Sequence, residues 1–227
     1  MSHVQQRIVD LSRQLARRGF FAATGGNLAL RVDEFHMAVT PSAVDYFAMR
    51  VEDVCVLRLK DLVQVSGECA PSVESSLHAR ILRNRPDVHC SIHTHQPIAS
   101  ACTLMGQPLE VDHPPLRKSL GRSIPLVGYA PSGTRWLASK LERAVRMNCN
   151  AYLMRNHGVL CCGPDIKTTL SRLEELEALC REKLLAMINK NTRSQPGGRA
   201  SVTRLLNALA SKSVPIGSPK NPSEMLP

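Results

Sequence analysis

The sequence is poor in aromatic residues and contains no long apolar segment. Phenylalanine, tryptophan and tyrosine make up 4% of the 227 residues, which leaves few rings to stack on nucleic-acid bases. No stretch approaches the roughly 20 consecutive apolar residues of a membrane span, and residues 1–19 lack the apolar core of a secretory signal. These absences predict a cytoplasmic protein that binds neither membranes nor nucleic acid, although its formal net charge is +10.

Two kinds of motif are also missing. None of the eight cysteines occurs in a CxxC pair, a spacing unsuited to a disulfide framework or a thiolate zinc site. We therefore expect reduced and mostly buried thiols. The chain contains neither GxGxxG nor a P-loop motif, so no nucleotide cofactor is expected. The positive charge fits a small anionic molecule as partner.

The periodicity of apolar residues predicts an α/β protein. Apolar residues at helical spacing predict helices, and apolar residues that alternate with polar ones predict strands. Helices are expected at 3–18, 71–84, 97–105, 132–147 and 165–189, and strands at 27–31, 36–40, 53–59, 88–95, 123–129, 151–155 and 159–163. Hairpin-like early strands indicate a partly antiparallel sheet. Residues 191–227 are basic and rich in proline, glycine and serine, and are expected to form a mostly mobile tail.

The stretch SIHTHQPIA, residues 91–99, places two histidines one residue apart at the end of a predicted strand. Residues i and i+2 of a strand face the same side, about 6.5–7 Å apart, so His93 and His95 could reach one cation. Open zinc sites commonly use three protein ligands and favour imidazole. Two polar residues at a strand end would look the same, and the spacing alone leaves both interpretations open.

Three further stretches carry candidate functional groups. RNHGVLCCG places His157 between a strand and a glycine, where a loop can project its ring toward the end of the sheet. PSVESSLH places Glu74 in the first turn of a helix, with His78 one turn later. Glu74 could instead stabilise the helix dipole, and His78 could be a histidine at the edge of the core. ATGGNLALR offers backbone N–H groups and Asn27 to an anion, or forms a simple glycine turn.

The ordered motifs TGGN, TPSA, PSVE, HTH and NHG resemble the class II aldolase/adducin family over roughly residues 4–190. This family includes L-fuculose-1-phosphate and L-rhamnulose-1-phosphate aldolases and L-ribulose-5-phosphate 4-epimerase. The resemblance implies one three-layer α/β domain over residues 1–190, with a central mixed, largely antiparallel sheet flanked by helices. It also implies a homo-oligomer, with a tetramer favoured. Its implied metal is one Zn²⁺ per chain, with Mn²⁺ or Co²⁺ as alternatives, held by His93, His95 and His157, with Glu74 as a catalytic carboxylate that can touch the metal.

The resemblance also assigns the contacts with the substrate. They fall on Gly26, Asn27, Ser42, Ala43, Ser72 and Val73. Ala43 replaces the usual glycine and Val73 the usual serine, which restricts the backbone at one position and removes a hydroxyl at the other. Fuculose-phosphate aldolases carry a tyrosine before the SIP strand, and His113 stands next to that position here. By contrast, YAPSGTRWL at 129–137 resembles the aldolase stretch YATFGTREL.

The implied function is that of a zinc-dependent lyase acting on a small sugar phosphate or a related polyhydroxy carbonyl compound. The reaction would be retro-aldol cleavage through a metal-stabilised enediolate, with Glu74 as acid and base. Two alternatives stay open. Arg117, Lys118 and Arg122 could hold a carboxylate, which favours decarboxylation of a 3-oxo sugar-acid phosphate on the same metal site, or they could form an ordinary solvated face. A non-catalytic binding module like the adducin head is the other, although such a module does not need a complete set of metal ligands.

Overall fold

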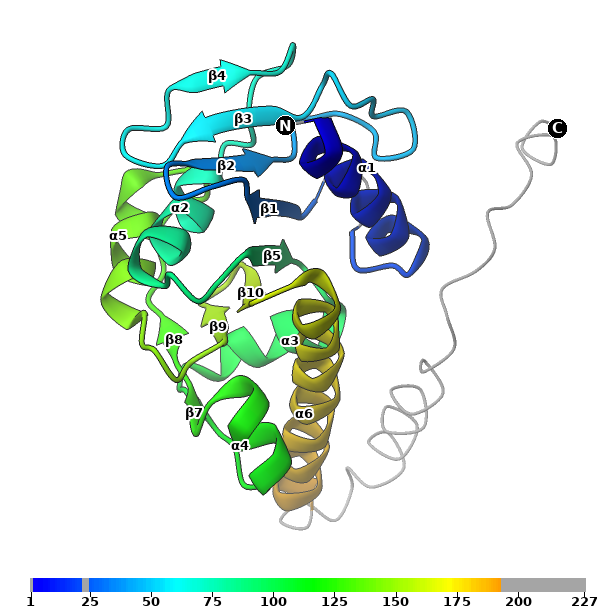
Figure 1. Ribbon diagram of the computed structural model, residues 1–227. Coiled ribbons are helices and arrows are strands. Elements are labelled where there is room, and N and C mark those ends of the chain that lie inside the picture. The colour runs from blue at the N-terminus through cyan, green and yellow to red at the C-terminus, as the bar shows by residue number, and fades with distance from the viewer. Residues whose placement is uncertain (1, 22–24, 193–227) are drawn as a thin grey trace, which may run out of the picture.

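A central sheet with helices on both faces forms the body of the molecule (Figure 1). The computed structural model describes residues 2–21 and 25–192, so all but the first two residues of the predicted tail lie outside the described part. Within those ranges the helices are α1 Ser2–Arg17, α2 Ser75–Asn84, α3 Pro97–Cys102, α4 Pro114–Leu120, α5 Arg135–Ala144 and α6 Ile166–Thr192, with a short 3-10 turn at Thr103–Met105. None of these helices is long and apolar enough to cross a bilayer.

The described strands form an eight-stranded main sheet and a small two-stranded one. The main sheet has the order β4-β3-β2-β1-β5-β10-β9-β8, and a separate pair joins β6 to β7. The strands are β1 Asn27–Arg31, β2 His36–Val39, β3 Cys55–Arg58, β4 Gln64–Ser66, β5 Cys90–Thr94, β6 Leu109–Glu110, β7 Ser123–Ile124, β8 Leu126–Val127, β9 Ala151–Met154 and β10 Gly158–Gly163. Every main-sheet pair is antiparallel except β8 with β9. The expected mixed, largely antiparallel sheet is confirmed.

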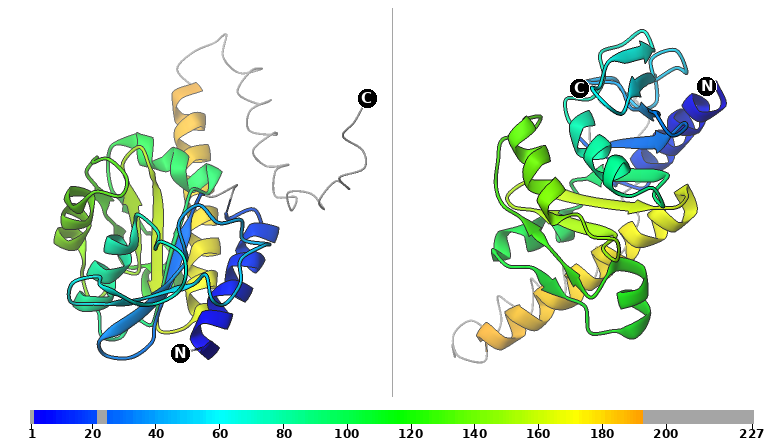
Figure 2. Two further views of the ribbon diagram at one scale, coloured as in Figure 1. Left: turned by 90° about the horizontal axis from the view of Figure 1, so that it is seen from above. Right: turned by 60° about the vertical axis from the view of Figure 1, so that its left-hand side comes forward.

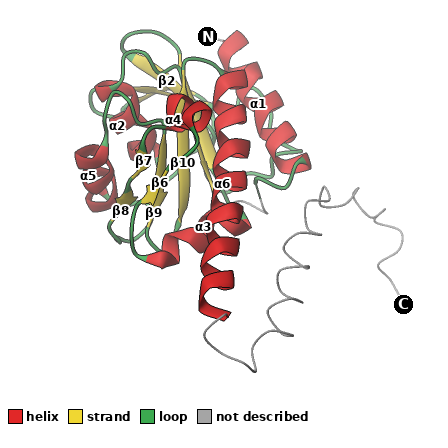
Figure 3. Ribbon diagram, turned by 90° about the horizontal axis from the view of Figure 1, so that it is seen from below, coloured by secondary structure: helices red, strands yellow, loops and turns green. Residues whose placement is uncertain are grey.

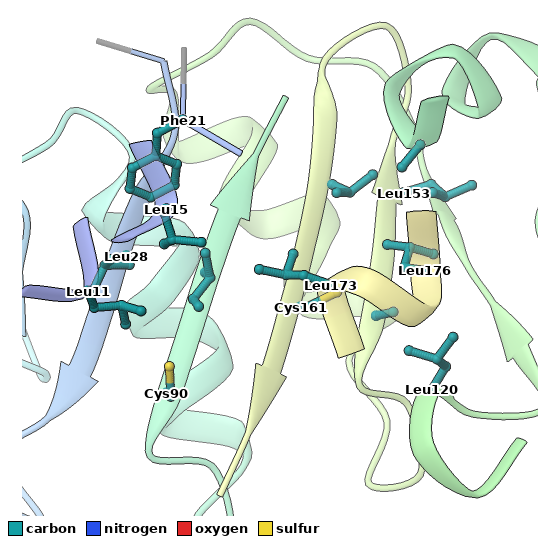
Figure 4. Close-up of a cluster of buried hydrophobic side chains, with 14 of the residues drawn as sticks. Leu11, Leu15, Phe21, Leu28, Cys90, Leu120, Leu153, Cys161, Leu173 and Leu176 are labelled. Carbon is teal, nitrogen blue, oxygen red and sulfur yellow. The ribbon is translucent and has the colours of Figure 1, made fainter. Parts of the chain in front are cut away.

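The helices form two outer layers that bury both faces of the sheet. Helices α1 and α6 cover one face, and α2 and α5 cover the other (Figures 2 and 3). The first core cluster joins Leu11 and Leu15 of α1 to Leu173 and Leu176 of α6 across the strands (Figure 4). The second joins α2 and α5 to the opposite strand faces. Because successive strand residues face opposite sides, a continuous apolar run such as that of β10 is buried on both faces.

Adjacent cysteines on β10 illustrate this arrangement. Cys161 belongs to the first core cluster and Cys162 to the second. All eight cysteines are free thiols, and seven of them are buried. Burial raises the pKa of Cys162 to about 12, so this thiol stays protonated at neutral pH. The expectation of mostly buried cysteines is confirmed.

Several predicted boundaries were wrong in detail. The strand expected at 123–129 is divided into β7 and β8 by Pro125, which has no N–H to donate to a ladder. Helix α2 begins at Ser75 rather than near residue 71. The short elements β6 and α4 were not predicted, although the two prolines that begin α4 are typical of a first helical turn.

Candidate metal centre

Three histidines converge at one end of the sheet. His93 lies on β5, His95 follows that strand, and His157 comes directly before β10, the antiparallel neighbour of β5. One ring nitrogen from each histidine lies within 4.8 Å of the others, and the ring centroids are 4.7 to 5.1 Å apart. The fold therefore brings together the two histidines of HTH and the histidine of NHG.

The carboxylate of Glu74 faces this cluster. Its Oε1 lies 3.1 Å from Nε2 of His157, and its Oε2 lies 3.2 Å from Nε2 of His93. Glu74 is 4% exposed and precedes α2 instead of lying in its first turn. Its side chain makes no capping hydrogen bond to the helix, so the alternative of a simple helix-start carboxylate does not describe its position.

Two donors hold the Glu74 carboxylate in place. The hydroxyl of Ser132 donates to Oε1 at 2.7 Å, and the amide of Asn27 donates to Oε2 at 2.8 Å. Burial raises the pKa of Glu74, but the hydrogen bonds with His157 and with these two donors outweigh it and leave the pKa below its ordinary value. Glu74 is therefore an ionised carboxylate at neutral pH.

Behind Glu74 lies a buried polar chain that the motifs did not reveal. His78 is fully buried, and its Nε2 donates to the side-chain amide oxygen Oδ1 of Asn27 at 2.7 Å while its Nδ1 accepts from the hydroxyl of Ser91 at 2.8 Å. Burial lowers the pKa of His78 to about 4, so the ring is neutral at neutral pH. Both ends of the Asn27 amide are thus occupied, which fixes the direction in which it donates to Glu74.

The hydrogen-bonding pattern of the cluster fits a bound cation. Nδ1 of His93 lies 2.8 Å from the carbonyl oxygen of Val159, which can only accept, so Nδ1 carries the proton and Nε2 presents a lone pair. Burial lowers the pKa of His93 to about 3, so Nε2 stays unprotonated although Oε2 of Glu74 lies 3.2 Å away. Two electron-rich atoms at this distance repel each other unless a cation lies between them.

The other two rings present nitrogens to the same cluster. Nε2 of His157 faces Oε1 of Glu74, while its Nδ1 is buried and has no hydrogen-bond partner among the described residues. Burial also lowers the pKa of His95, which favours its neutral, ligating form. Imidazole nitrogens with one carboxylate form a donor set that suits Zn²⁺ and related divalent metals. The residues present therefore fit a metal ion.

Comparison with known proteins agrees with this geometry. Residues 6–184 match the Class II Aldolase and Adducin N-terminal domain. The chain belongs to this family. As a member with a three-histidine cluster, it is a metal-dependent lyase of the class II aldolase family.

Three relatives show how far the similarity extends. A 5-methylthioribulose-1-phosphate/5-deoxyribulose-1-phosphate aldolase from Rhodospirillum rubrum is 29% identical over 175 residues, 77% of each chain. A methylthioribulose-1-phosphate dehydratase from Stenotrophomonas maltophilia is 28% identical over 190 residues, which cover 79% of this chain and 89% of that protein. The structure of an L-fuculose 1-phosphate aldolase matches with a TM-score of 0.75 and 26% identity, covering 94% of this chain and 97% of the other. The class II aldolase-like fold is confirmed.

The segments expected to contact substrate lie beside Glu74 in this aldolase-family fold. The backbone N–H of Ser72 donates to the carbonyl of Thr40, and that of Ser42 donates to the carbonyl of Ala70. These bonds join the TPSA loop to the segment that carries Glu74. Asn27 reaches the same carboxylate from β1. The fold therefore gathers the predicted contacts of all three loops around Glu74, and their roles in substrate binding stay predictions.

The backbone and side chains of these loops show what Ala43, Gly26 and Val73 do at their positions. Ala43 has a φ of 55°, in the left-handed region that favours glycine. Gly26 has a φ of 98°, and a Cβ there would lie 2.4 Å from the ring of Phe21. Val73 is 65% exposed and presents methyl groups where the family has a hydroxyl, while the Ser72 hydroxyl accepts from the N–H of Glu74 at 3.3 Å.

His113 is placed apart from the metal cluster within the single chain. It precedes α4, and its Nε2 lies 3.3 Å from a carboxylate oxygen of Glu182 on α6. Arg117, Lys118 and Arg122 line a groove with Asn150 and Pro164, next to the start of β9 and the end of β10, whereas His157 precedes β10. The cations considered for holding a substrate carboxylate are therefore not beside the histidines of the same chain.

Gly158 is expected to be intolerant of any side chain. A Cβ at this position would lie 2.5 Å from the carbonyl oxygen of Thr94 and 2.5 Å from Cδ2 of His95. We predict that Gly158→Ala lowers the free energy of unfolding by about 1–3 kcal/mol and reduces metal content, measured by denaturant unfolding and elemental analysis. Gly128→Ala is the matched control, since only the flexible end of Lys140 lies near that position. Equal stability of the two variants would contradict this packing argument.

Ser132 is expected to lower the pKa of Glu74, because its hydroxyl donates directly to the carboxylate. We predict that Ser132→Ala lowers kcat by about 3–10-fold, the equivalent of one lost hydrogen bond. Removal of a donor to the ionised form raises the pKa of Glu74 from its lowered value, so the acid limb of the kcat–pH profile should move to higher pH. Ser132→Thr keeps the hydroxyl and should restore the profile. An unmoved acid limb in Ser132→Ala would refute this assignment.

Proposed function

We propose that the protein is a zinc-dependent lyase that cleaves a carbon–carbon bond of a small sugar phosphate or related polyhydroxy carbonyl compound by a retro-aldol reaction. The observation that carries this proposal is the joint arrangement of three histidine nitrogens within 4.8 Å and a buried carboxylate 3.1 and 3.2 Å from two of them. His93, His95 and His157 would hold the metal. Glu74 would be the acid and base, and would also reach the metal.

The chemistry follows from the environment of each group. When bound, a divalent metal polarises carbonyl and hydroxyl oxygens and stabilises the negative charge that develops during carbon–carbon cleavage. Glu74 is ionised and can accept the proton of a substrate hydroxyl, then return it to carbon. Asn27 and Ser132 hold the two carboxylate oxygens in fixed directions. Glu74 and His93 are buried, which shields them from bulk water and strengthens their interactions, whereas His95 lies at the exposed side of the cluster.

The substrate class is supported by the relatives and by the loops around Glu74. The named relatives act on 1-phosphates of five- and six-carbon ketoses. The proposed contacts are Gly26, Asn27, Ser42, Ala43, Ser72 and Val73, which lie in the three loops next to the carboxylate. Val73 supplies no hydroxyl, so we expect fewer hydrogen bonds to the phosphate than in relatives with serine at this position.

Assembly into a homotetramer is part of the proposal. His113 is half-exposed and lies beside Glu182 in the single chain, so a contact with substrate requires it to come from a neighbouring subunit. Light scattering of the purified protein tests the assembly. If the protein is a monomer that is fully active at the same concentration, the proposed role of His113 is wrong.

A substrate screen tests the reaction. Zinc-loaded protein is incubated with a panel of ketose 1-phosphates and 3-oxo-tetronate 4-phosphates, and release of aldehyde and carbon dioxide is measured separately. We expect aldehyde from at least one ketose 1-phosphate without carbon dioxide. Carbon dioxide release from a tetronate phosphate, with no aldehyde from any ketose, would replace the aldolase proposal with the decarboxylase. Failure of both reactions in fully metal-loaded protein would support a non-catalytic binding role.

A further inference from the structure

The groove lined by Arg117, Lys118 and Arg122 lies at the other end of the sheet from the metal centre. It has a volume of about 750 Å³ and is lined by residues of α4, α6 and the segments before β5 and β9. Pro164, which follows β10, lines the groove, whereas His157 precedes β10. The six residues of that strand correspond to about 20 Å. The groove is therefore separate from the cluster of histidines in the same chain.

The groove carries an excess of positive charge. Five cationic side chains and one carboxylate line it: Arg85, Arg117, Lys118, Arg122, Arg172 and Asp87. The carboxylate is already paired, because Arg85 donates to both oxygens of Asp87 at 2.8 and 2.7 Å. The other four cations form no ion pair with any described residue. Their mutual repulsion is unfavourable, and a bound anion would relieve it.

Arg172 provides a second, independent indication of a ligand. Its Nη1 donates to the carbonyl oxygen of Cys162 at 2.6 Å, which fixes the guanidinium at the wall of the groove. Its Nε is buried and has no hydrogen-bond partner among residues 2–21 and 25–192. Gly163 makes this close approach possible, since a Cβ there would lie 2.8 Å from Nη1. One donor of this fixed guanidinium, the Nε–H, thus lacks an acceptor, which is costly.

We propose that this groove binds a phosphorylated small molecule that carries at least two negative charges. Guanidinium groups match phosphate oxygens with paired hydrogen bonds, and four unpaired cations exceed what a single carboxylate would neutralise. The volume is in the range of small-molecule sites, about 300–1,000 Å³. A nucleic-acid strand is a poorer fit, because the residues that line the groove include no aromatic ring for base stacking.

Occupancy of the groove would link elements that are distant in the sequence. Arg117 and Lys118 lie in the last turn of α4, and Arg172 lies on α6. An anion between them would join these two helices, so it should raise the melting temperature of the protein. This inference does not depend on the reaction at the metal centre.

Calorimetric titration of the full chain with inorganic pyrophosphate tests the proposal, with chelator in excess so that no metal takes part. The test variant is Lys118→Gln/Arg122→Gln, in which both side chains are exposed. The matched control is Arg17→Gln/Lys60→Gln, which removes the same two residue types at exposed positions that do not line the groove. We expect the Kd to rise at least about 10-fold in the test variant and less than about 2-fold in the control.

Each contrary result has a defined meaning. Equal weakening in both variants would show diffuse attraction to a basic protein and would overturn the proposal. Acetate that displaces pyrophosphate at equal concentration would also contradict the phosphate class. A single-stranded oligonucleotide that binds more tightly than pyrophosphate, with the same loss in the test variant, would replace it with a nucleic-acid surface. A change in oligomeric state of the test variant, without change in pyrophosphate affinity, would assign the groove to a contact between copies of the chain.

Discussion

Replacement of His93 by alanine is expected to remove the metal and to abolish activity. His93 is fully buried on β5, and its Nε2 lies 2.9 Å from Nε2 of His95 and 3.2 Å from Oε2 of Glu74, so it occupies the centre of the donor set. Its other nitrogen is fixed by the carbonyl oxygen of Val159, and such partners hold a ligating ring in the correct orientation. Loss of this ring leaves two histidines, which bind a divalent metal far more weakly.

Metal analysis of protein purified without chelator measures this effect directly. The unaltered chain should contain about one divalent metal ion per chain, and His93→Ala less than about one-tenth of that. Activity should fall by more than about 100-fold, and His157→Ala should behave in the same way. Reconstitution with Zn²⁺, Mn²⁺ and Co²⁺ in turn would identify the metal that restores the highest activity.

His89→Ala is the matched control for this experiment. His89 is exposed and lies just before the same strand, outside the three-histidine cluster. It should leave metal content and activity unchanged. If His93→Ala retains the metal content of His89→Ala while the protein stays folded by circular dichroism, the assignment of the metal centre is wrong.

The metal centre could be predicted from the sequence because its ligands lie in short motifs whose residue types and spacing suit metal binding. The i, i+2 spacing of His93 and His95 follows from strand geometry, and the glycine after His157 follows from the need for a close approach between β10 and the end of β5. What joins the two motifs is the antiparallel pairing of these strands. A single sequence does not show that pairing, and only the resemblance to a family indicated that the three histidines bind one metal.

Long-range side-chain contacts could not be predicted in the same way. Ser132 lies 58 residues from Glu74 in the chain, and a serine in a loop looks the same whether or not its hydroxyl meets a carboxylate. His78 was recognised as a histidine of the helix, yet its bonds to Asn27 and Ser91 depend on the packing of α2 against β1 and β5. The sequence shows that Arg117 and Lys118 belong to a basic segment, but only the fold shows that they line one groove together with Arg172.

Replacement of Glu74 by glutamine is expected to stop proton transfer while it preserves the shape of the site. Glutamine has the same size as glutamate, but its amide is no base at neutral pH, so kcat should fall by about 10²–10⁴-fold, the usual contribution of a general acid–base group. Metal content should fall less than in His93→Ala, because the three imidazoles stay in place. A larger loss of metal than of activity would mean that Glu74 acts mainly as a ligand.

A partial reaction separates these two roles of Glu74. Retro-aldol cleavage of a ketose 1-phosphate between its third and fourth carbons yields an aldehyde and the enediolate of dihydroxyacetone phosphate, and the enzyme must then add a proton to the former third carbon of this enediolate. In deuterium oxide, metal-loaded protein should therefore incorporate deuterium into added dihydroxyacetone phosphate, and Glu74→Gln with the same metal content should not. Ser132→Ala should retain the exchange at a moderately reduced rate, because it removes one hydrogen bond to the carboxylate and leaves the base itself. Full exchange in Glu74→Gln would assign the proton transfer to another group, and the position of Glu74 between two histidines would then be explained by metal binding alone.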